Sequence, residues 1–179
     1  MADRIYFKIQ GAQQGLISAG ASSEDSLGND KQEEHQDEIF VQAFNHIVAR
    51  PVDPRSGQPA GARAHQPITI TKYVDKSTPL LYSALVTGEG LTECVLKFYR
   101  DTNQKPNQHY FTITLTNARI VNITASRPTF LNQTEFRDDS LRPPPISHLE
   151  EVSLSYGKIE WHHEVANTQA LDDTTKPAS

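Results

Sequence analysis

Apolar and polar residues alternate along much of this chain. Ile5, Phe7 and Ile9 share one parity in the first alternating segment, which ends at Gly11. The same period of two recurs in the segments 38–48, 68–73, 91–100, 110–125 and 151–165. A period of two is typical of β-strands that bury one face. The pattern therefore predicts a mainly β fold.

One segment changes period within a few residues. The strand pattern of 68–73 is followed by a helix motif made of Asp75, Ser77, Thr78 and Pro79. Thr78 is predicted to cap the helix by accepting a hydrogen bond from a free backbone N–H, and Pro79 suits the first turn. Leu81 and Leu85 lie one turn apart, and Gly88 suits the left-handed end of a helix. We predict one short helix of about ten residues.

Three of the predicted strands depart from a simple pattern. Segment 38–48 is apolar on both parities, which suggests that its second face is also covered. In 110–125, Val121 is expected on the core parity, opposite a row of threonines that includes Thr112 and Thr114. That row fits either a smooth polar wall or ordinary β-propensity. The apolar parity of 151–165 slips at Gly157, where we predict a β-bulge.

Long polar segments separate these strands. Residues 11–36 are rich in Gly, Ser, Asn and acids, and we expect a loop outside the core. Residues 49–66 contain several prolines together with Arg50, Arg55, Arg63 and His65. They predict an extended surface loop that either reaches a neighbouring molecule or stays solvated. Residues 127–148 are expected to form an irregular connection.

Length and composition suit a single soluble domain. The 179 residues are 36% hydrophobic, so we expect one domain over 1–165 and a flexible tail over 166–179. A net charge of −5 without a Lys/Arg run argues against nucleic acid or an anionic membrane as partner. No apolar run is long enough to insert in a membrane, and the N-terminus lacks the pattern of a secretory signal, so a cytoplasmic start is expected. The single Cys94 is expected to be a buried thiol.

Motifs for catalysis or cofactor binding are missing from the sequence, and we predict neither. His162 and His163 are neighbours on a strand and point to opposite faces. A zinc site that combines one of them with His46 or His148 stays open as an alternative. The acidic residues Asp30, Glu33, Glu34 and Asp37 lack the spacing of a calcium loop. They are interpreted as a solvated surface or a surface between subunits.

Three segments together carry a family resemblance: 5–11, 71–81 and 149–161. They resemble the haemolysin-coregulated protein family, the inner-tube proteins of the bacterial type VI secretion system. The resemblance implies a compact β-barrel of two sheets with one helix, six copies of which form a ring. Rings of such proteins stack into a tube inside a contractile sheath on a baseplate, carry a trimeric spike protein, and enclose effector cargo. The tube then leaves the cell without a signal peptide.

The resemblance also suggests roles for particular residues. Arg50, Arg55, Arg63 and His65 would lie on the loop that bridges stacked rings, facing the acids of 30–38 on the next ring. The lumen should carry short neutral groups, for which Ala43, Asn45, Thr112 and Thr114 are the candidates. Two alternatives are a monomeric ligand-binding barrel and a secreted effector with no role in a tube.

Overall fold

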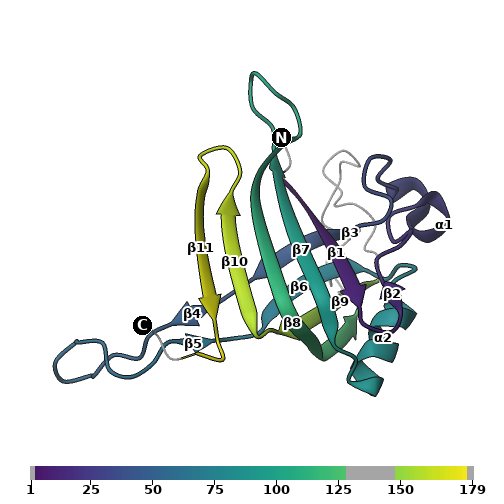
Figure 1. Ribbon diagram of the computed structural model, residues 1–179. Coiled ribbons are helices and arrows are strands. Elements are labelled where there is room, and N and C mark those ends of the chain that lie inside the picture. Colours follow the sequence, from purple (N-terminus) through teal and green to yellow (C-terminus); the bar gives the residue numbers. More distant parts are fainter. Residues whose placement is uncertain (1–2, 128–147, 177–179) are drawn as a thin grey trace, which may run out of the picture.

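Among the residues that the computed structural model describes, 3–127 and 148–176, nine strands form one sheet that curls into a barrel, and two more form a hairpin (Figure 1). The strands are β1 (Arg4–Gly11), β2 (Gly15–Leu16), β3 (Ile39–Asn45), β4 (Val48–Ala49), β5 (Ala64–His65), β6 (Ile68–Tyr73), β7 (Leu91–Arg100), β8 (Gln108–Ser126), β9 (Leu149–Ser155), β10 (Lys158–His163) and β11 (Thr168–Asp173). The helices are α1 (Glu24–Leu27), the 3-10 helix η1 (Gly28–Asp30) and α2 (Thr78–Thr87). The predicted β-rich fold is confirmed, with α1 as an additional short helix.

The barrel closes because β9 pairs with two strands at once. The sheet order is β11-β10-β8-β7-β1-β3-β6-β9, with β2 beside β1, and β9 also pairs with β8. Residues of β8 up to Ala118 pair with β7, whereas those from Arg119 pair with β9. Asn117, just before this change of partner, has a φ of 53°, a left-handed conformation that asparagine adopts more readily than most residues. The long β8 strand therefore belongs to both walls of the barrel.

Gly157 separates β9 from β10 beside this change of partner. Its N–H donates to the carbonyl oxygens of Thr116 and Asn117, each at 3.2 Å. A Cβ at this position would lie 3.3 Å from the Cβ of Asn117, so a larger residue would crowd the crossing. The predicted bulge in a continuous strand is wrong, because the chain instead breaks into two strands with different partners. The parity argument still holds, since Val152 and Ile159 are buried in the same core.

Irregular pairing also changes which residues of β3 and β8 face the core. A register shift between Val41 and Ala43 brings Phe44 against the core and leaves Ala43 and Asn45 exposed. Within the single chain the second face of β3 stays partly open, so the expectation that something covers it remains a prediction about contacts with other molecules. Val121 is 47% exposed, so its predicted core position is wrong. The parity of β8 changes at its bend, which a strict period of two does not anticipate.

Side chains fill the interior of the barrel. Fully buried residues from five strands meet there: Phe7, Ile9, Ile68, Ile70, Cys94, Leu96, Leu115, Val152 and Leu154. Helix α2 packs against this core with Leu81 and Ala84 and contacts β8. Cys94 is buried as predicted, and burial raises the pKa of its thiol to about 12. The thiol is thus protonated and unreactive at neutral pH.

Residues 11–36 belong partly to the core, contrary to the prediction of a loop outside it. Ile17 and Ala21 are fully buried and pack with the barrel residues. The carboxylate of Glu89, just after α2, accepts the backbone N–H groups of Gln13 and Gln14 at 2.6 and 2.9 Å. Burial acts to raise the pKa of Glu89, but the hydrogen bonds from Gln14 and Gln13 have the larger combined effect. The net result is a lowered pKa for this carboxyl group. The excursion is therefore fastened to the barrel by an ionised carboxylate.

Helix α2 begins one residue away from the predicted cap. Ser77 is the N-cap, Pro79 lies in the first turn, and Gly88 ends the helix with a φ of 68°. The hydroxyl of Thr78 accepts a hydrogen bond of 3.1 Å from the backbone N–H of Asp75, a residue that precedes the helix. The predicted role of Thr78 as the helix cap is therefore wrong. Asp75 instead accepts both the N–H and the hydroxyl of Ser77, at 2.8 and 2.6 Å. No helix in the described part of the chain has the length and apolar character to span a bilayer.

A buried lysine joins β6, the start of α2 and β9. The side chain of Lys72 is 0% exposed, and its Nζ lies 2.7 Å from Glu150 Oε1 and 2.9 Å from Asp75 Oδ1. Its remaining hydrogen bonds go to the carbonyl of Tyr73 at 2.7 Å and the hydroxyl of Thr78 at 3.2 Å. Thr78 also donates to Glu150 Oε1 at 2.7 Å. A buried ammonium needs such a complete set of partners, because an unpaired buried charge costs several kcal/mol.

The segment predicted as a flexible tail contains a regular strand. Thr168–Asp173 form β11 and pair antiparallel with the whole of β10. The prediction of a tail from residue 166 is wrong there. Its residues are polar because β11 is exposed along its length, which the sequence does not distinguish from a disordered end.

We expect Lys72→Ala to destabilise the fold strongly, because it leaves Asp75 and Glu150 as buried carboxylates without their cation. The predicted loss is about 3–5 kcal/mol in the free energy of unfolding, measured by urea denaturation. Lys105→Ala, at an exposed position, is the control and should change stability by less than about 0.5 kcal/mol. Equal midpoints for the two variants would show that the buried pairs do not hold the fold.

Candidate assembly surfaces

An extended loop projects from one end of the barrel (Figure 1). Its base is the β4–β5 hairpin, in which Val48 pairs with His65 and Ala49 pairs with Ala64. Val52 is 60% exposed near the far end of the loop. Apolar side chains displayed on a projecting loop are typical of a contact with another molecule.

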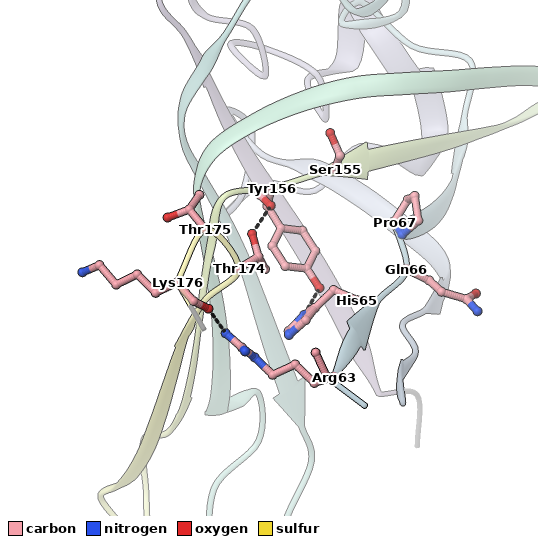
Figure 2. A pocket seen from close by; sticks show the side chains of 10 residues that line it. Arg63, His65, Gln66, Pro67, Ser155, Tyr156, Thr174, Thr175 and Lys176 are labelled. Atoms are coloured by element: carbon pink, nitrogen blue, oxygen red, sulfur yellow. Dashed lines mark hydrogen bonds between the residues drawn. The ribbon is translucent and has the colours of Figure 1, made fainter. Parts of the chain in front are cut away.

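A cluster that we call the clasp fixes the base of this loop to the C-terminal strand. It consists of His46, Arg63, His65, Tyr156 and Asp172. The Tyr156 hydroxyl lies 2.7 Å from His46 Nε2 and 2.8 Å from His65 Nδ1 (Figure 2 shows the bond to His65). The Asp172 carboxylate accepts a hydrogen bond of 2.7 Å from His65 and a bidentate pair of hydrogen bonds from Arg63. The clasp joins segments that are more than 100 residues apart in the sequence.

Burial and charge set the ionisation of the clasp. Burial, and then the Asp172 charge, raises the pKa of Tyr156 to about 12. Burial, followed by the neighbouring His65, lowers the pKa of His46. The hydrogen bond from Arg63 is the largest cause that lowers the pKa of Asp172. At neutral pH the phenol therefore carries its proton and Asp172 is a carboxylate. An open hollow of about 480 Å³ lies beside the clasp, lined by Arg63 and Tyr156 among others (Figure 2).

The four loop residues predicted to contact another ring divide into two pairs. Arg63 and His65 have partners within the same chain and hold the loop in place. Arg50 and Arg55 are exposed, and neither forms a salt bridge with the described residues. Only the latter two are free to meet acids of another molecule.

All four predicted acidic residues lie exposed on the far side of the barrel from the extended loop (Figure 1). Asp37 accepts the N–H of Gly20 at 2.9 Å, and Glu34 accepts the amide of Asn107 at 3.3 Å. Glu33 lies 3.7 Å from Lys31, and Asp30 lies at the end of η1. The residue that anchors this segment is Glu38, which contacts His35 at 2.6 Å and Lys97 at 2.5 Å.

Four neighbouring strands share an outward face of short polar side chains, which we call the small-polar face. Asn45 of β3 pairs with Thr69 of β6, which pairs with Ser153 of β9. Thr69 and Ser153 also bond through their hydroxyls at 2.9 Å. Directly paired residues point to the same side of a sheet. The complete face, including the next row and β8, is Ala43, Asn45, Thr69, Thr71, Asn122, Thr124, Glu151 and Ser153.

Thr112 and Thr114 lie on the opposite wall of the barrel. Thr112 pairs with Lys97 and His162, and Thr114 with Val95 and Glu160. The predicted neutral wall is therefore wrong here, since charged residues flank both threonines. Because β3 and β6 form the rear wall while β7 and β10 form the front (Figure 1), the four lumen candidates cannot line one surface. Ala43 and Asn45 belong together, and Thr112 and Thr114 do not join them.

A metal centre is not found in the described part of the chain, where no group of three His, Cys, Asp or Glu could hold an ion. His162 contacts Glu164 at 3.2 Å, whereas His163 packs on Tyr110. No sequence pattern predicts the partnership of Tyr156 with His46 and His65, because these residues come together only in the folded barrel.

The fold and the sequence are similar to those of known secretion proteins. A family model described as "Type VI secretion system effector, Hcp" matches residues 6–163. The "Major exported protein" of Pseudomonas aeruginosa is 43% identical over 179 residues, which are 100% of this chain and 99% of that protein. This chain belongs to the Hcp family.

Solved structures of Hcp proteins agree with this assignment. A crystal structure of an Hcp protein shares 40% sequence identity with a TM-score of 0.85, and covers 96% of this chain and 99% of that one. The secreted Hcp3 of Pseudomonas aeruginosa is also 40% identical, with a TM-score of 0.76 and coverage of 96% and 98%. The family resemblance read from the sequence is thus confirmed.

Proposed function

We propose that this Hcp family member is a structural subunit of the type VI secretion inner tube. Six copies would close into a ring, and rings would stack into a tube that sheath contraction expels together with effector cargo. The observation that carries the proposal is agreement with Hcp structures over nearly the whole chain. The role is structural, and we assign no chemistry to any residue.

The positions of the surfaces support a head-to-tail assembly. Such an assembly buries two different patches on each subunit, and rotation about an axis closes it into a ring. The free edge of β11 and the extended loop offer contacts at one side of the molecule, and the acidic segment lies at the other (Figure 1). The filled barrel interior argues against the alternative of a monomeric barrel that holds a small ligand.

Further partners follow from the same proposal. A tube of this kind would contact the sheath, the baseplate and a trimeric spike protein, and would assemble in the cytoplasm before it is fired. The "Major exported protein" name of the relative from Pseudomonas aeruginosa fits export of the subunit itself.

The native chain should sediment as a ring of several times its 20.0 kDa mass. Analytical ultracentrifugation at increasing concentration measures this, and negative-stain electron microscopy should show annular particles. Ring closure explains why growth sideways stops at one size. A stable 20.0 kDa species at high concentration, without annular particles, would rule out the tube role.

Arg50 and Arg55 are proposed to stack rings by meeting Glu33 and Glu34 of the next ring. Each exposed pair contributes only about 0–1 kcal/mol, but six copies act together. The double change Arg50→Glu with Arg55→Glu should leave rings intact and shorten the tubes seen by electron microscopy. Adding Glu33→Arg and Glu34→Arg to the same chain should restore their length. Tubes of native length in the first variant would refute this contact.

The small-polar face is proposed to line the lumen, because all of its side chains except that of Glu151 are short and uncharged, and such groups can contact varied cargo weakly. Asn45→Trp should narrow that wall and lower the steady-state amount of effectors of the same secretion system, measured by immunoblotting in the parent cells. Thr114→Trp, on the opposite wall, is the matched control and should leave effector amounts unchanged. Size exclusion confirms rings in both. If only Thr114→Trp lowers the effectors, the other wall lines the lumen.

A further inference from the structure

The clasp contains two histidines that share one hydroxyl oxygen. His46 Nε2 and His65 Nδ1 lie 2.7 and 2.8 Å from the oxygen of Tyr156. Both imidazole rings also stack on Trp161, with centroid distances of 6.1 and 6.5 Å. The hydrogen bonding of the two rings is therefore coupled through one oxygen atom.

With both rings neutral, every polar hydrogen of the clasp has an acceptor. His65 donates from Nε2 to Asp172, so its Nδ1 accepts the Tyr156 hydroxyl, and His46 donates from Nε2 to the same phenol oxygen. One added proton is tolerated when it sits on His65. The Tyr156 hydroxyl then turns to donate to His46, whose Nε2 becomes the acceptor.

A second proton cannot be tolerated in this way. With both imidazoles charged, each donates to Tyr156, and the phenol O–H has lost both of its acceptors. Two cations then face each other across one oxygen in a half-buried site. We propose that the clasp is a proton-operated latch, which stays closed with one bound proton and releases the extended loop when His46 and His65 are both protonated.

The charged groups around the latch do not offset the second proton. Arg63 already neutralises Asp172, the one carboxylate bonded to His65. Asp173, next along β11, lies 3.3 Å from Lys176 and accepts from Thr175. The other neighbours of His46 are the aromatic rings of Phe44 and Trp161. The second proton is thus an uncompensated positive charge.

The direction of the pKa of His46 agrees with opening in acid. Burial and the neighbouring His65 lower it from the ordinary value of about 6.5. Between about 6.5 and the lowered pKa, an unlatched chain therefore binds more protons than the closed one. The closed state loses stability as the pH falls through this window. This inference concerns the loop of a single chain and does not depend on the tube role.

Trp161 provides a direct test because it is the single tryptophan of the chain. Acrylamide quenching of its fluorescence in the purified full-length protein, from pH 8 to pH 5, reports whether the two imidazoles still cover it. Its accessibility should rise in acid, and the opening equilibrium should change by about tenfold per pH unit, since opening binds one proton beyond the one that the closed clasp holds. Hydrogen exchange of residues 46–66, corrected for intrinsic rates, should rise in parallel. That second measurement separates loop release from simple quenching by a charged imidazole.

Variants distinguish the latch from other effects of acid. His46→Gln leaves His65 as the one histidine in contact with Tyr156, and the closed clasp tolerates a proton there, so the acid-dependent opening should be lost. Tyr156→Phe removes the shared oxygen and should expose Trp161 already at pH 8. The matched control is His109→Gln, because burial also lowers the pKa of His109, which stacks on Tyr99 instead. It should keep the native slope. Far-UV circular dichroism checks that each variant is folded.

Three results would overturn the latch. The first is Trp161 accessibility, or exchange of residues 46–66, that does not change between pH 8 and pH 5. The second is a Tyr156→Phe variant in which Trp161 is as protected at pH 8 as in the native chain. The third is a His46→Gln variant as pH-dependent as the native chain, which would mean that acid acts through other groups, for example by separating assembled copies.

Discussion

One buried ammonium group fixes the register on which the surfaces of this protein depend. Lys72 and Glu150 are directly paired residues of β6 and β9, and both side chains point into the protein beside Asp75. A slip of one residue would turn Glu150 outward together with Val152 and Leu154, which are fully buried in the native register. The same register places Ser153 in the small-polar face. The buried ion pair inside the barrel thereby determines which side chains of these strands face outward.

The extended loop depends on a second set of polar contacts, which differ from the first in exposure. Lys72 has no contact with solvent, whereas the clasp lies at a half-buried site beside an open hollow. Water and protons therefore reach the clasp but not the core cluster. The buried Lys72 cluster gives the molecule a rigid barrel, and the clasp gives it a loop whose attachment responds to the solvent. Such a division is expected where one part of a protein must keep its shape and another must make contacts.

Local patterns in the sequence revealed most of the strands and helix α2, because alternation and turn residues act over short distances. Gly88 and Pro79 have the positions that their backbone preferences dictate. The pattern failed where pairing partners change, as at Asn117 and in β3, since a bend or bulge shifts parity without a distinctive residue. It also missed β11, whose polar residues resemble a loose end. The division of the lumen candidates between two walls could not be foreseen, because it follows from closure of the barrel.

The chain leaves the barrel at the base of its own projecting loop. Arg63 donates to the carbonyl oxygens of Asp173 and Lys176, at 2.8 and 3.1 Å, so the last described residues run alongside β5 (Figure 2). A protein inserted directly after Lys176 would begin at this point. An affinity tag or a passenger domain would thus crowd the root of the loop, whereas the small-polar face lies on another wall. The choice of terminus for a label therefore decides which surface an experiment disturbs.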